Sequence, residues 1–273
     1  MNETLALAFG IGLIIGSFVN VLIYRLPRMV MSHTAPGHDD ATDRFDLCWP
    51  ASHCTHCLTP LKFWQNIPVL SFIWLKGRCG FCHHAIPLLY PCIEIFTASI
   101  WLLSAWHWGF NATGLCWAFF ITALMAASVI DWQTTLLPDV LTQSLVWIGL
   151  IASTLGWIPA TPAQSIWGAI AGYASLWTVA TAFERLTGKQ GMGAGDFKLL
   201  AGLGAWLGPL ALIPLVLLAS LAGTLVGLFL KFTHQLGEDG YIPFGPFMAI
   251  SGVLIAVLGM APIAEWLGWS FFA

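Results

Sequence analysis

Long apolar runs separated by short polar segments set the pattern of this chain. A transmembrane helix needs about 20 apolar residues, and most of the runs reach or approach that length. They lie at roughly 5–24, 88–106, 113–130, 140–157, 165–183, 210–230 and 243–262, with a shorter run at roughly 197–208. The shorter run must also cross if the basic residues on its two sides share a compartment, and its length indicates thinned bilayer or protein-buried backbone. The pattern predicts an all-α polytopic membrane protein with about eight transmembrane helices.

Composition agrees with this class and excludes others. Of the 273 residues, 58% are hydrophobic and 8% are charged, whereas soluble domains carry about 25% charged residues. The chain therefore lacks the polar surface of a soluble globular enzyme, and it is too apolar to be disordered. Its net charge of -3 provides no basic surface for nucleic acid.

The positions of Lys and Arg predict how the chain is oriented. Basic residues concentrate in cytoplasmic loops, and with the N-terminus outside all ten fall on the cytoplasmic side. The ten are Arg25, Arg28, Arg44, Lys62, Lys76, Arg78, Arg185, Lys189, Lys198 and Lys231. We therefore expect both termini in the periplasm, with the stretch 25–87 in the cytoplasm. The first run lacks an AxA-like cleavage site, so we expect a retained anchor rather than a signal peptide.

Two CxxC pairs lie in this cytoplasmic stretch. Cys54-Thr-His-Cys57 and Cys79-Gly-Phe-Cys82 are separated by 21 residues. Zinc takes four thiolates in a tetrahedron, and two short knuckles supply that geometry. We expect Gly77 and Gly80 to provide the tight turning of the second knuckle. The pattern predicts a structural zinc site, and a dithiol redox site is the alternative.

Two aspartates end or begin apolar runs at the same expected depth. Asp131 follows the run 113–130, and Asp196 precedes the run 197–208. A charge in the bilayer core costs about 2.5–3.5 kcal/mol on insertion scales, so each needs an explanation. Two adjacent carboxylates can share one proton, which allows one to activate water while the other protonates a carbonyl. The alternative is an interfacial carboxylate paired with Lys198 or Arg185.

Glycines have two expected roles. Gly12 and Gly16 lie four residues apart in one apolar run, a spacing that lets helices approach closely. Gly193 and Gly195 precede Asp196 and would let an extended substrate backbone lie against the site.

Two further carboxylates compete for a role. Asp139 follows Pro138 at the start of an apolar run, where a helix cap is expected. Glu94 lies inside the run 88–106. An ionisable residue there is either functional or paired with a neighbouring helix.

Taken together, the motifs and their order along the chain resemble those of one family. The matching segments are Gly16–Pro27, Trp64–Ser71 between the cysteine pairs, Tyr90–Glu94, Asp131 with Leu137–Asp139, Gly193–Lys198, and Ile242–Phe247. The chain is similar to the type IV prepilin peptidases over nearly its whole length. An acidic insert at 38–46 departs from the pattern, and its role stays open.

The resemblance implies a bacterial inner-membrane aspartic protease of the GxGD kind. Such enzymes cleave the basic leader of type IV prepilins or type II secretion pseudopilins. Members with the cysteine loop also N-methylate the new N-terminal residue, usually Phe, with S-adenosylmethionine. Asp131 and Asp196 align with the catalytic aspartates, and the four cysteines with those of the family. Gly193, Gly195 and Lys198 belong to the GxGD segment and are expected to shape the site.

This resemblance implies a division of labour along the chain. Residues 1–24 form the first transmembrane helix, 25–87 a zinc-binding loop associated with methyl transfer, and 88–273 a seven-helix peptidase domain. Glu94 is a candidate methyltransferase residue. The rival functions are a membrane thiol oxidoreductase using the cysteines and a transporter using the two aspartates as proton carriers.

Overall fold

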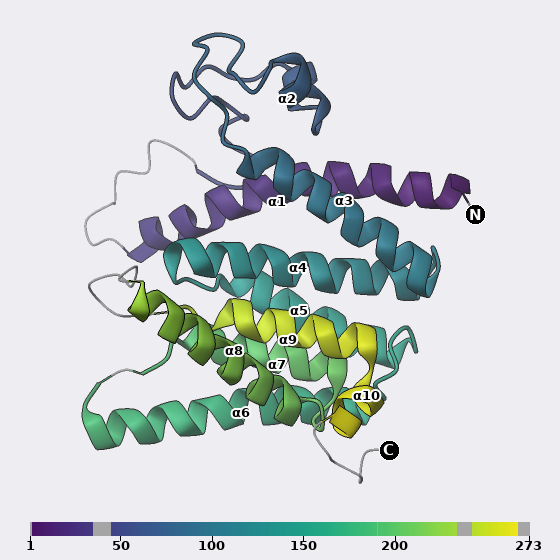
Figure 1. The fold of residues 1–273 in the computed structure, drawn as a ribbon, viewed down its shortest axis with the longest axis vertical. Coiled ribbons are helices and arrows are strands. Elements are labelled where there is room, and N and C mark those ends of the chain that lie inside the picture. Colours follow the sequence, from purple (N-terminus) through teal and green to yellow (C-terminus); the bar gives the residue numbers. More distant parts are fainter. Residues whose placement is uncertain (1, 35–44, 190, 234–241, 267–273) are drawn as a thin grey trace. The chain divides into compact units, whose positions relative to one another are not determined.

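The computed structural model describes residues 2–34, 45–189, 191–233 and 242–266, and their regular structure is helical. The longer helices are α1 (Asn2–Thr34), α3 (Leu89–Trp108), α4 (Ala112–Thr134), α5 (Asp139–Thr154), α6 (Pro162–Thr187), α7 (Ala194–Leu207), α8 (Leu212–Phe232) and α9 (Gly245–Leu258) (Figure 1). The short elements are η1 (Phe63–Asn66), α2 (Leu70–Trp74) and α10 (Met260–Trp266). Each predicted apolar run is helical, which confirms the all-α class. Most of the acidic insert, residues 38–44, lies outside the described residues.

Among the described helices, α1, α3, α4, α6 and α8 are long and apolar enough to cross a membrane. The chain is therefore a multi-pass membrane protein. Helices α5 and α9 are apolar but shorter, and α7 has only 14 residues.

Helix α1 continues ten residues beyond the expected end at residue 24 and contains Pro27. Tertiary contacts begin just beyond residue 24. Arg25 is buried, and its guanidinium donates hydrogen bonds to the backbone oxygens of Asp46 and Pro50 at 2.7 and 2.6 Å. Through these bonds Arg25 attaches the following loop to the helix. Hydropathy alone does not reveal this attachment.

The chain forms two compact units, Met1–Thr122 (unit 1) and Ala123–Ala273 (unit 2). The boundary falls within α4, between its first and second halves. The division into 1–24, 25–87 and 88–273 concerned function rather than packing, and it stays a prediction.

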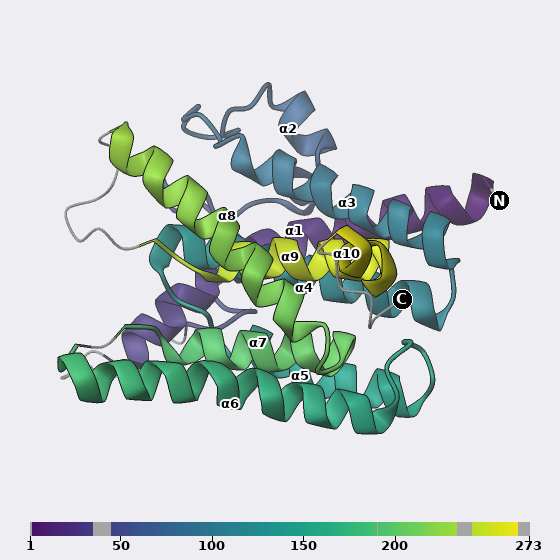
Figure 2. The ribbon, with the colours of Figure 1, turned by 60° about the horizontal axis from the view of Figure 1, so that its bottom comes forward.

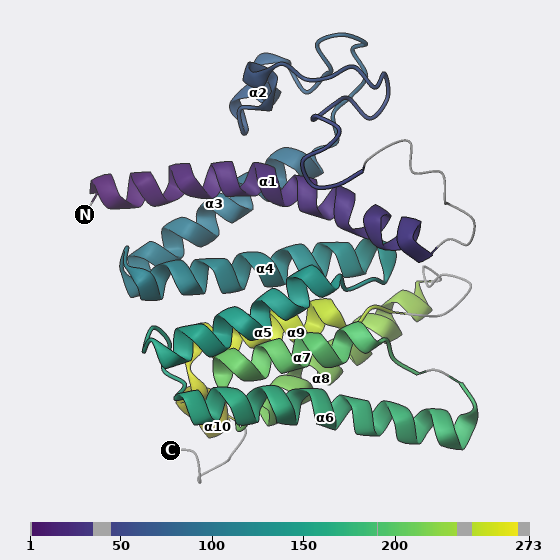
Figure 3. The same cartoon turned by 180° about the vertical axis from the view of Figure 1, so that it is seen from behind.

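Unit 1 is built on close packing of α1 against α3 (Figure 3). A Cβ atom at Gly12 would lie 2.6 Å from the Cα of Ala98, and one at Gly16 would lie 2.7 Å from the Cα of Glu94. The backbones therefore touch where the two glycines face α3, which confirms the expected role of this spacing. Asn20, one turn further along α1, donates to the backbone oxygen of Tyr90 at 3.1 Å.

Unit 2 surrounds the short helix α7. Helices α5 and α6 pack along it, and α9 also contacts it (Figure 2). Nearly every residue from Asp196 to Trp206 is buried. At 1.5 Å per residue, 14 residues extend about 21 Å, which is less than the roughly 30 Å hydrocarbon core. Because protein covers α7, its length need not match the bilayer, and the expectation of protein-buried backbone is confirmed.

Backbone contact between α6 and α7 makes this burial possible. A Cβ at Gly204 would collide with the backbone oxygen of Gly168, and the reverse holds as well. Ser165 donates to the Ala205 oxygen at 2.5 Å, and the Trp206 indole donates to the Leu145 oxygen at 2.8 Å. Polar side chains thus tie α7 to both neighbours inside the apolar unit.

We predict that Gly204→Ala destabilises the protein, because the added methyl meets a rigid backbone carbonyl. Overpacking of this kind costs about 1–3 kcal/mol. Gly10→Ala is the control, since a Cβ there has no neighbour within 4 Å. Thermal unfolding in detergent should show a lower midpoint for Gly204→Ala than for the unmodified chain. The midpoint of Gly10→Ala should be unchanged. Equal midpoints for the two variants would contradict this account of the α6–α7 contact.

Candidate active site and metal centre

Asp131 lies in the last turn of α4 and is buried, with 3% of its surface exposed. Its Oδ2 accepts a hydrogen bond of 3.0 Å from the backbone N–H of Gly245, the first residue of α9. The first N–H groups of a helix have no partner within the helix, so they are available as donors. The start of α9 therefore supplies the polar partner that a buried carboxylate needs.

Asp196 lies in the first turn of α7 and is also buried, with 4% exposed. Its backbone N–H donates to the oxygen of Gly193 at 3.2 Å. This position at a helix N-terminus places the carboxylate near the positive end of the helix dipole.

Leu137, in the connection between α4 and α5, packs beside the helix starts that border both aspartates. A Cβ at Gly195 would lie 2.6 Å from the Leu137 Cβ, and a Cβ at Gly245 would lie 2.5 Å from Oδ2 of Asp131 and 3.5 Å from the Leu137 Cδ1. The charge of Asp131 also acts on the Asp196 carboxyl. The two aspartates that the sequence pairs are therefore both buried beside the same connection.

The glycines before Asp196 have different surroundings. Gly195 is in tight contact with Leu137, so a side chain there would push the α4–α5 connection away. Gly193 has ordinary extended backbone, with φ -76° and ψ 149°, and a Cβ there would meet only Oδ2 of Asp196, at 3.7 Å. The space beside Gly193 is therefore open next to the carboxylate.

Lys198 pairs with Asp139 rather than with either buried aspartate. Its Nζ lies 2.6 Å from Oδ1 of Asp139, and both side chains are partly exposed, at 30% and 57%. The expected capping role of Asp139 is wrong. Pro138 occupies the N-cap position of α5, and no side chain caps that helix. The Asp139 carboxylate instead pairs with Lys198, which lies 59 residues away in sequence.

In unit 1, the two cysteine pairs fold into turns of the same geometry. Leu58 N–H donates to the Cys54 oxygen at 2.9 Å, and His83 N–H donates to the Cys79 oxygen at 3.0 Å. In each turn the N–H of the first cysteine also donates to the carbonyl five residues later, at 3.0 and 2.8 Å. Leu58 and His83 both have φ 57°. Two equivalent knuckles therefore face one another.

The two glycines of the second knuckle act differently from one another. Gly77 has φ +67° and supplies the expected turn. Gly80 is needed for space, because a Cβ there would lie 2.6 Å from Nε2 of Gln65. Gln65 is buried and its side-chain oxygen accepts from Lys62 N–H at 2.9 Å. Gln65 thus packs the segment between the knuckles onto the second one.

The sulfur atoms of Cys54, Cys57, Cys79 and Cys82 all lie within 4.8 Å of one another. The sulfurs of Cys54 and Cys82 are 3.9 Å apart. A tetrahedral ion with metal–sulfur bonds of about 2.3 Å places its ligands about 3.8 Å apart. The four thiols are therefore spaced to hold one metal ion.

Hydrogen bonds prepare two of these thiols for metal binding. Bonds from Thr59 lower the pKa of Cys57 to about 6, and backbone bonds from Cys82 and Phe81 lower the pKa of Cys79. The His84 backbone also lowers the pKa of Cys82, but burial and the three other thiols outweigh it and raise that pKa to about 11. Four thiolates repel one another, so a bound cation is needed to hold them all ionised.

Glu94 connects α3 to the loop that carries the cysteines. Its Oε2 accepts a hydrogen bond of 2.8 Å from the backbone N–H of Val69. Sequence reasoning missed both this donor and the Gly245 N–H, because every residue except proline offers a backbone N–H. The only signal was that Trp64–Ser71 and Ile242–Phe247 are motifs to which no role was assigned.

Two family models match the chain. The bacterial peptidase A24 N-terminal domain matches residues 11–108, and the type IV leader peptidase family matches residues 118–228. The chain belongs to the type IV leader peptidase family. The first match contains the four cysteines and Glu94, and the second contains Asp131 and Asp196.

Several relatives of this family are named prepilin leader peptidase/N-methyltransferase. One from Pseudomonas putida is 41% identical over 263 residues, covering 93% of this chain and 91% of the relative. One from Dickeya chrysanthemi is 42% identical over 273 residues, covering 95% of this chain and 93% of the relative. One from Neisseria gonorrhoeae is 40% identical over 259 residues, covering 91% of this chain and 88% of the relative. No solved structure matches the chain significantly.

We predict about one metal ion per purified chain, because the four sulfurs form one ligand set. Cys79→Ser should lower the metal content severalfold, since a closed site depends on all four thiolates. Cys48→Ser is the control, because Cys48 is exposed and outside the cluster. Elemental analysis with thiol titration measures both. A metal-free protein with four freely titrating thiols would overturn the assignment.

Proposed function

We propose that this chain cleaves the basic leader peptide of type IV prepilins or type II secretion pseudopilins and N-methylates the new N-terminal residue. The cleavage is assigned to Asp131 and Asp196. The observation that carries this assignment is the pair of buried carboxylates in unit 2, in a family whose relatives are named for both activities.

Peptide hydrolysis by this pair needs one carboxylate ionised and the other protonated. The ionised carboxylate takes a proton from water, and the water oxygen attacks the scissile carbonyl carbon. The protonated carboxylate gives its proton to the carbonyl oxygen. The tetrahedral intermediate then collapses. The first carboxylate, now protonated, gives its proton to the departing nitrogen as the C–N bond breaks, and the second takes the proton from a hydroxyl of the intermediate. Both carboxylates thereby return to their starting protonation states, so the proton count balances.

The open position beside Gly193 supports the approach of an extended substrate. With no side chain at residue 193, a substrate backbone can lie against the Asp196 carboxylate. Gly195 shapes the site by admitting Leu137, and the Lys198–Asp139 pair ties the start of α7 to the start of α5.

The metal in unit 1 is assigned as a structural zinc ion. Four cysteine sulfurs without an open position are typical of structural zinc, whereas catalytic sites keep a position for water. Its role is to fold the segment 25–87, which we associate with methyl transfer, whereas both aspartates of the peptidase lie within residues 88–273.

The methyl donor implied by the family is S-adenosylmethionine, which supplies an electrophilic methyl group. Unit 1 has a cavity of about 180 Å³ beside the cysteine loop. Sites that enclose ligands of drug size have volumes of about 300–1,000 Å³. The cavity is therefore too small to enclose the whole donor.

The chain is placed in the bacterial inner membrane with its carboxylates toward the cytoplasm. The ten basic residues support periplasmic termini and eight crossings, with α5, α7 and α9 as short spans. In this orientation the site lies where a cytoplasmic leader meets the hydrophobic helix of a prepilin.

Two rival functions make different demands. A transporter needs its carboxylates on a path across the membrane, but Asp131 ends α4 and Asp196 begins α7. A thiol oxidoreductase needs a disulfide that forms and breaks, whereas the four thiols are free and arranged as one ligand set. Cleavage of a leader-bearing prepilin by the purified protein favours the peptidase over both.

We predict that Asp131→Asn or Asp196→Asn lowers cleavage at least about 100-fold, because the amide keeps the size but removes the shared proton. Asp139→Asn is the matched control. It loses one exposed ion pair, an interaction worth about 0–1 kcal/mol, and should retain most activity. The assay is cleavage of a purified prepilin by equal amounts of each variant. An inactive Asp139→Asn with an active Asp131→Asn would show that the wrong carboxylates were paired.

A further inference from the structure

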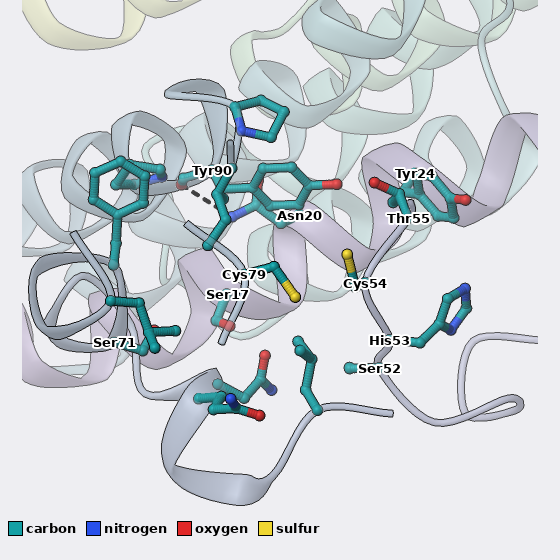
Figure 4. Close-up of a pocket in the computed structure, with 18 of the residues that line it drawn as sticks. Ser17, Asn20, Tyr24, Ser52, His53, Cys54, Thr55, Ser71, Cys79 and Tyr90 are labelled. Carbon is teal, nitrogen blue, oxygen red and sulfur yellow. Dashed lines mark hydrogen bonds between the residues drawn. The ribbon is translucent and has the colours of Figure 1, made fainter. Parts of the chain in front are cut away.

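The cavity of unit 1 lies between the cysteine loop and the helices α1 and α3 (Figure 4). Ser17 and Asn20 of α1 line it, together with Tyr90 and Glu94 of α3. Cys54 and Cys79, the first cysteines of the two knuckles, line it from the loop. Cys54 and Cys79 therefore belong both to the thiol cluster and to the lining of the cavity. Metal binding by the four thiols does not itself require such a cavity.

The lining is mixed, and its polar part includes Arg25, His53 and His84. The Arg25 guanidinium is bonded to the backbone oxygens of Asp46 and Pro50. Leu61, Phe72, Leu75 and Ile86 provide apolar surface, and all four come from the cysteine loop. Glu94 provides a half-buried carboxylate from α3. A cavity with one carboxylate and an apolar wall suits a ligand that carries a cationic group beside an apolar body.

The Glu94 carboxylate is held by strained backbone. Val69, whose N–H donates to Oε2, has φ 61° and ψ -47°. Positive φ is a genuine outlier for a β-branched residue, and such strain persists only where surrounding structure enforces it. The Val69 N–H thus fixes the carboxylate at the edge of the cavity, which Ser17 of α1 also lines.

The volume limits the size of the ligand. A cavity of about 150 Å³ in an engineered protein binds benzene, and this cavity measures about 180 Å³. It accommodates one aromatic ring with a small polar group, and it is too small for a nucleoside-sized ligand.

We propose that this cavity binds the N-terminal aromatic residue of the processed substrate, with its ring on the apolar wall and its α-ammonium on Glu94. This inference rests on the proposed function, which produces such an N-terminus. An ammonium has no lone pair and must lose a proton before it can be methylated. The N–H bond breaks, the proton passes to a carboxylate oxygen of Glu94, and the electron pair stays on nitrogen.

The test is calorimetric titration of the full-length protein in nanodiscs with L-phenylalaninamide, using empty nanodiscs as the blank. N-acetyl-L-phenylalaninamide keeps the ring but lacks the charge, and L-alaninamide keeps the charge but lacks the ring. We expect each to bind at least about tenfold more weakly than L-phenylalaninamide, because the first cannot pair its charge with Glu94 and the second cannot bury a ring on the apolar wall. Equal binding of all three would overturn the proposal.

Glu94→Gln should weaken binding of L-phenylalaninamide at least about tenfold, because the amide oxygen still accepts from Val69 but carries no charge. Glu184→Gln is the matched control, on an exposed residue near the end of α6. Metal content of Glu94→Gln should equal that of the unmodified chain, which shows that the loop is intact. Unchanged affinity in Glu94→Gln would overturn the role of the carboxylate.

A second pair of variants tests the cavity without altering its charge. Ser71 of α2 lines the cavity, whereas Ile73 of the same helix is 61% exposed and does not. Ser71→Trp should abolish binding of L-phenylalaninamide, and Ile73→Trp should leave it unchanged. If Ser71→Trp instead abolished binding of S-adenosylhomocysteine alone, the cavity would belong to the methyl donor and the proposal would fail.

Prepilin cleavage measured on the same samples separates this proposal from the proposed function. Cleavage by Glu94→Gln with weakened binding of L-phenylalaninamide supports both. Cleavage with unaltered binding in Glu94→Gln and Ser71→Trp contradicts the cavity assignment alone. Selective binding without any cleavage by the unmodified chain supports the cavity and contradicts the peptidase.

Discussion

The burial of two carboxylates in an apolar helical unit is the constraint on which the rest of unit 2 depends. A buried polar group is costly unless it is hydrogen-bonded, and regular helix interiors have no free donors. Asp131 and Asp196 therefore lie at helix ends, where the start of α9 supplies the Gly245 N–H. The glycine contact between α6 and α7 lets backbone pack directly on backbone, which helps to bury the helix that begins beside Asp196. The site thus follows from where helices begin and end.

Unit 1 meets the same constraint with different chemistry. In its loop, four thiols spaced for one ion replace the apolar core that so short a segment lacks. Backbone strain at Leu58 and His83 closes the two knuckles. The Glu94–Val69 bond then attaches the cysteine loop to α3. The thiol cluster and the Glu94 carboxylate both border the cavity between loop and helices.

Much of this could be predicted from sequence, because hydropathy and spacing are local properties. Apolar runs located the helices, and the CxxC spacing located the thiol cluster. Long-range polar contacts could not be predicted. Arg25 of α1 bonds to backbone oxygens of the following loop, and the Asp139 carboxylate pairs with Lys198 rather than capping its own helix. The hydrogen bonds from the Gly245 and Val69 backbones could not be predicted either, since a backbone N–H has no signature in the sequence.

The central claim is that the two activities belong to separate units, with the metal serving methylation. Mass spectrometry of the mature pilin N-terminus from a strain carrying Cys79→Ser tests this most directly. The account predicts a cleaved pilin whose N-terminal residue is unmethylated, while a Cys48→Ser strain yields cleaved and methylated pilin. A Cys79→Ser strain that accumulates the enzyme at normal levels but leaves the prepilin uncleaved would contradict the claim.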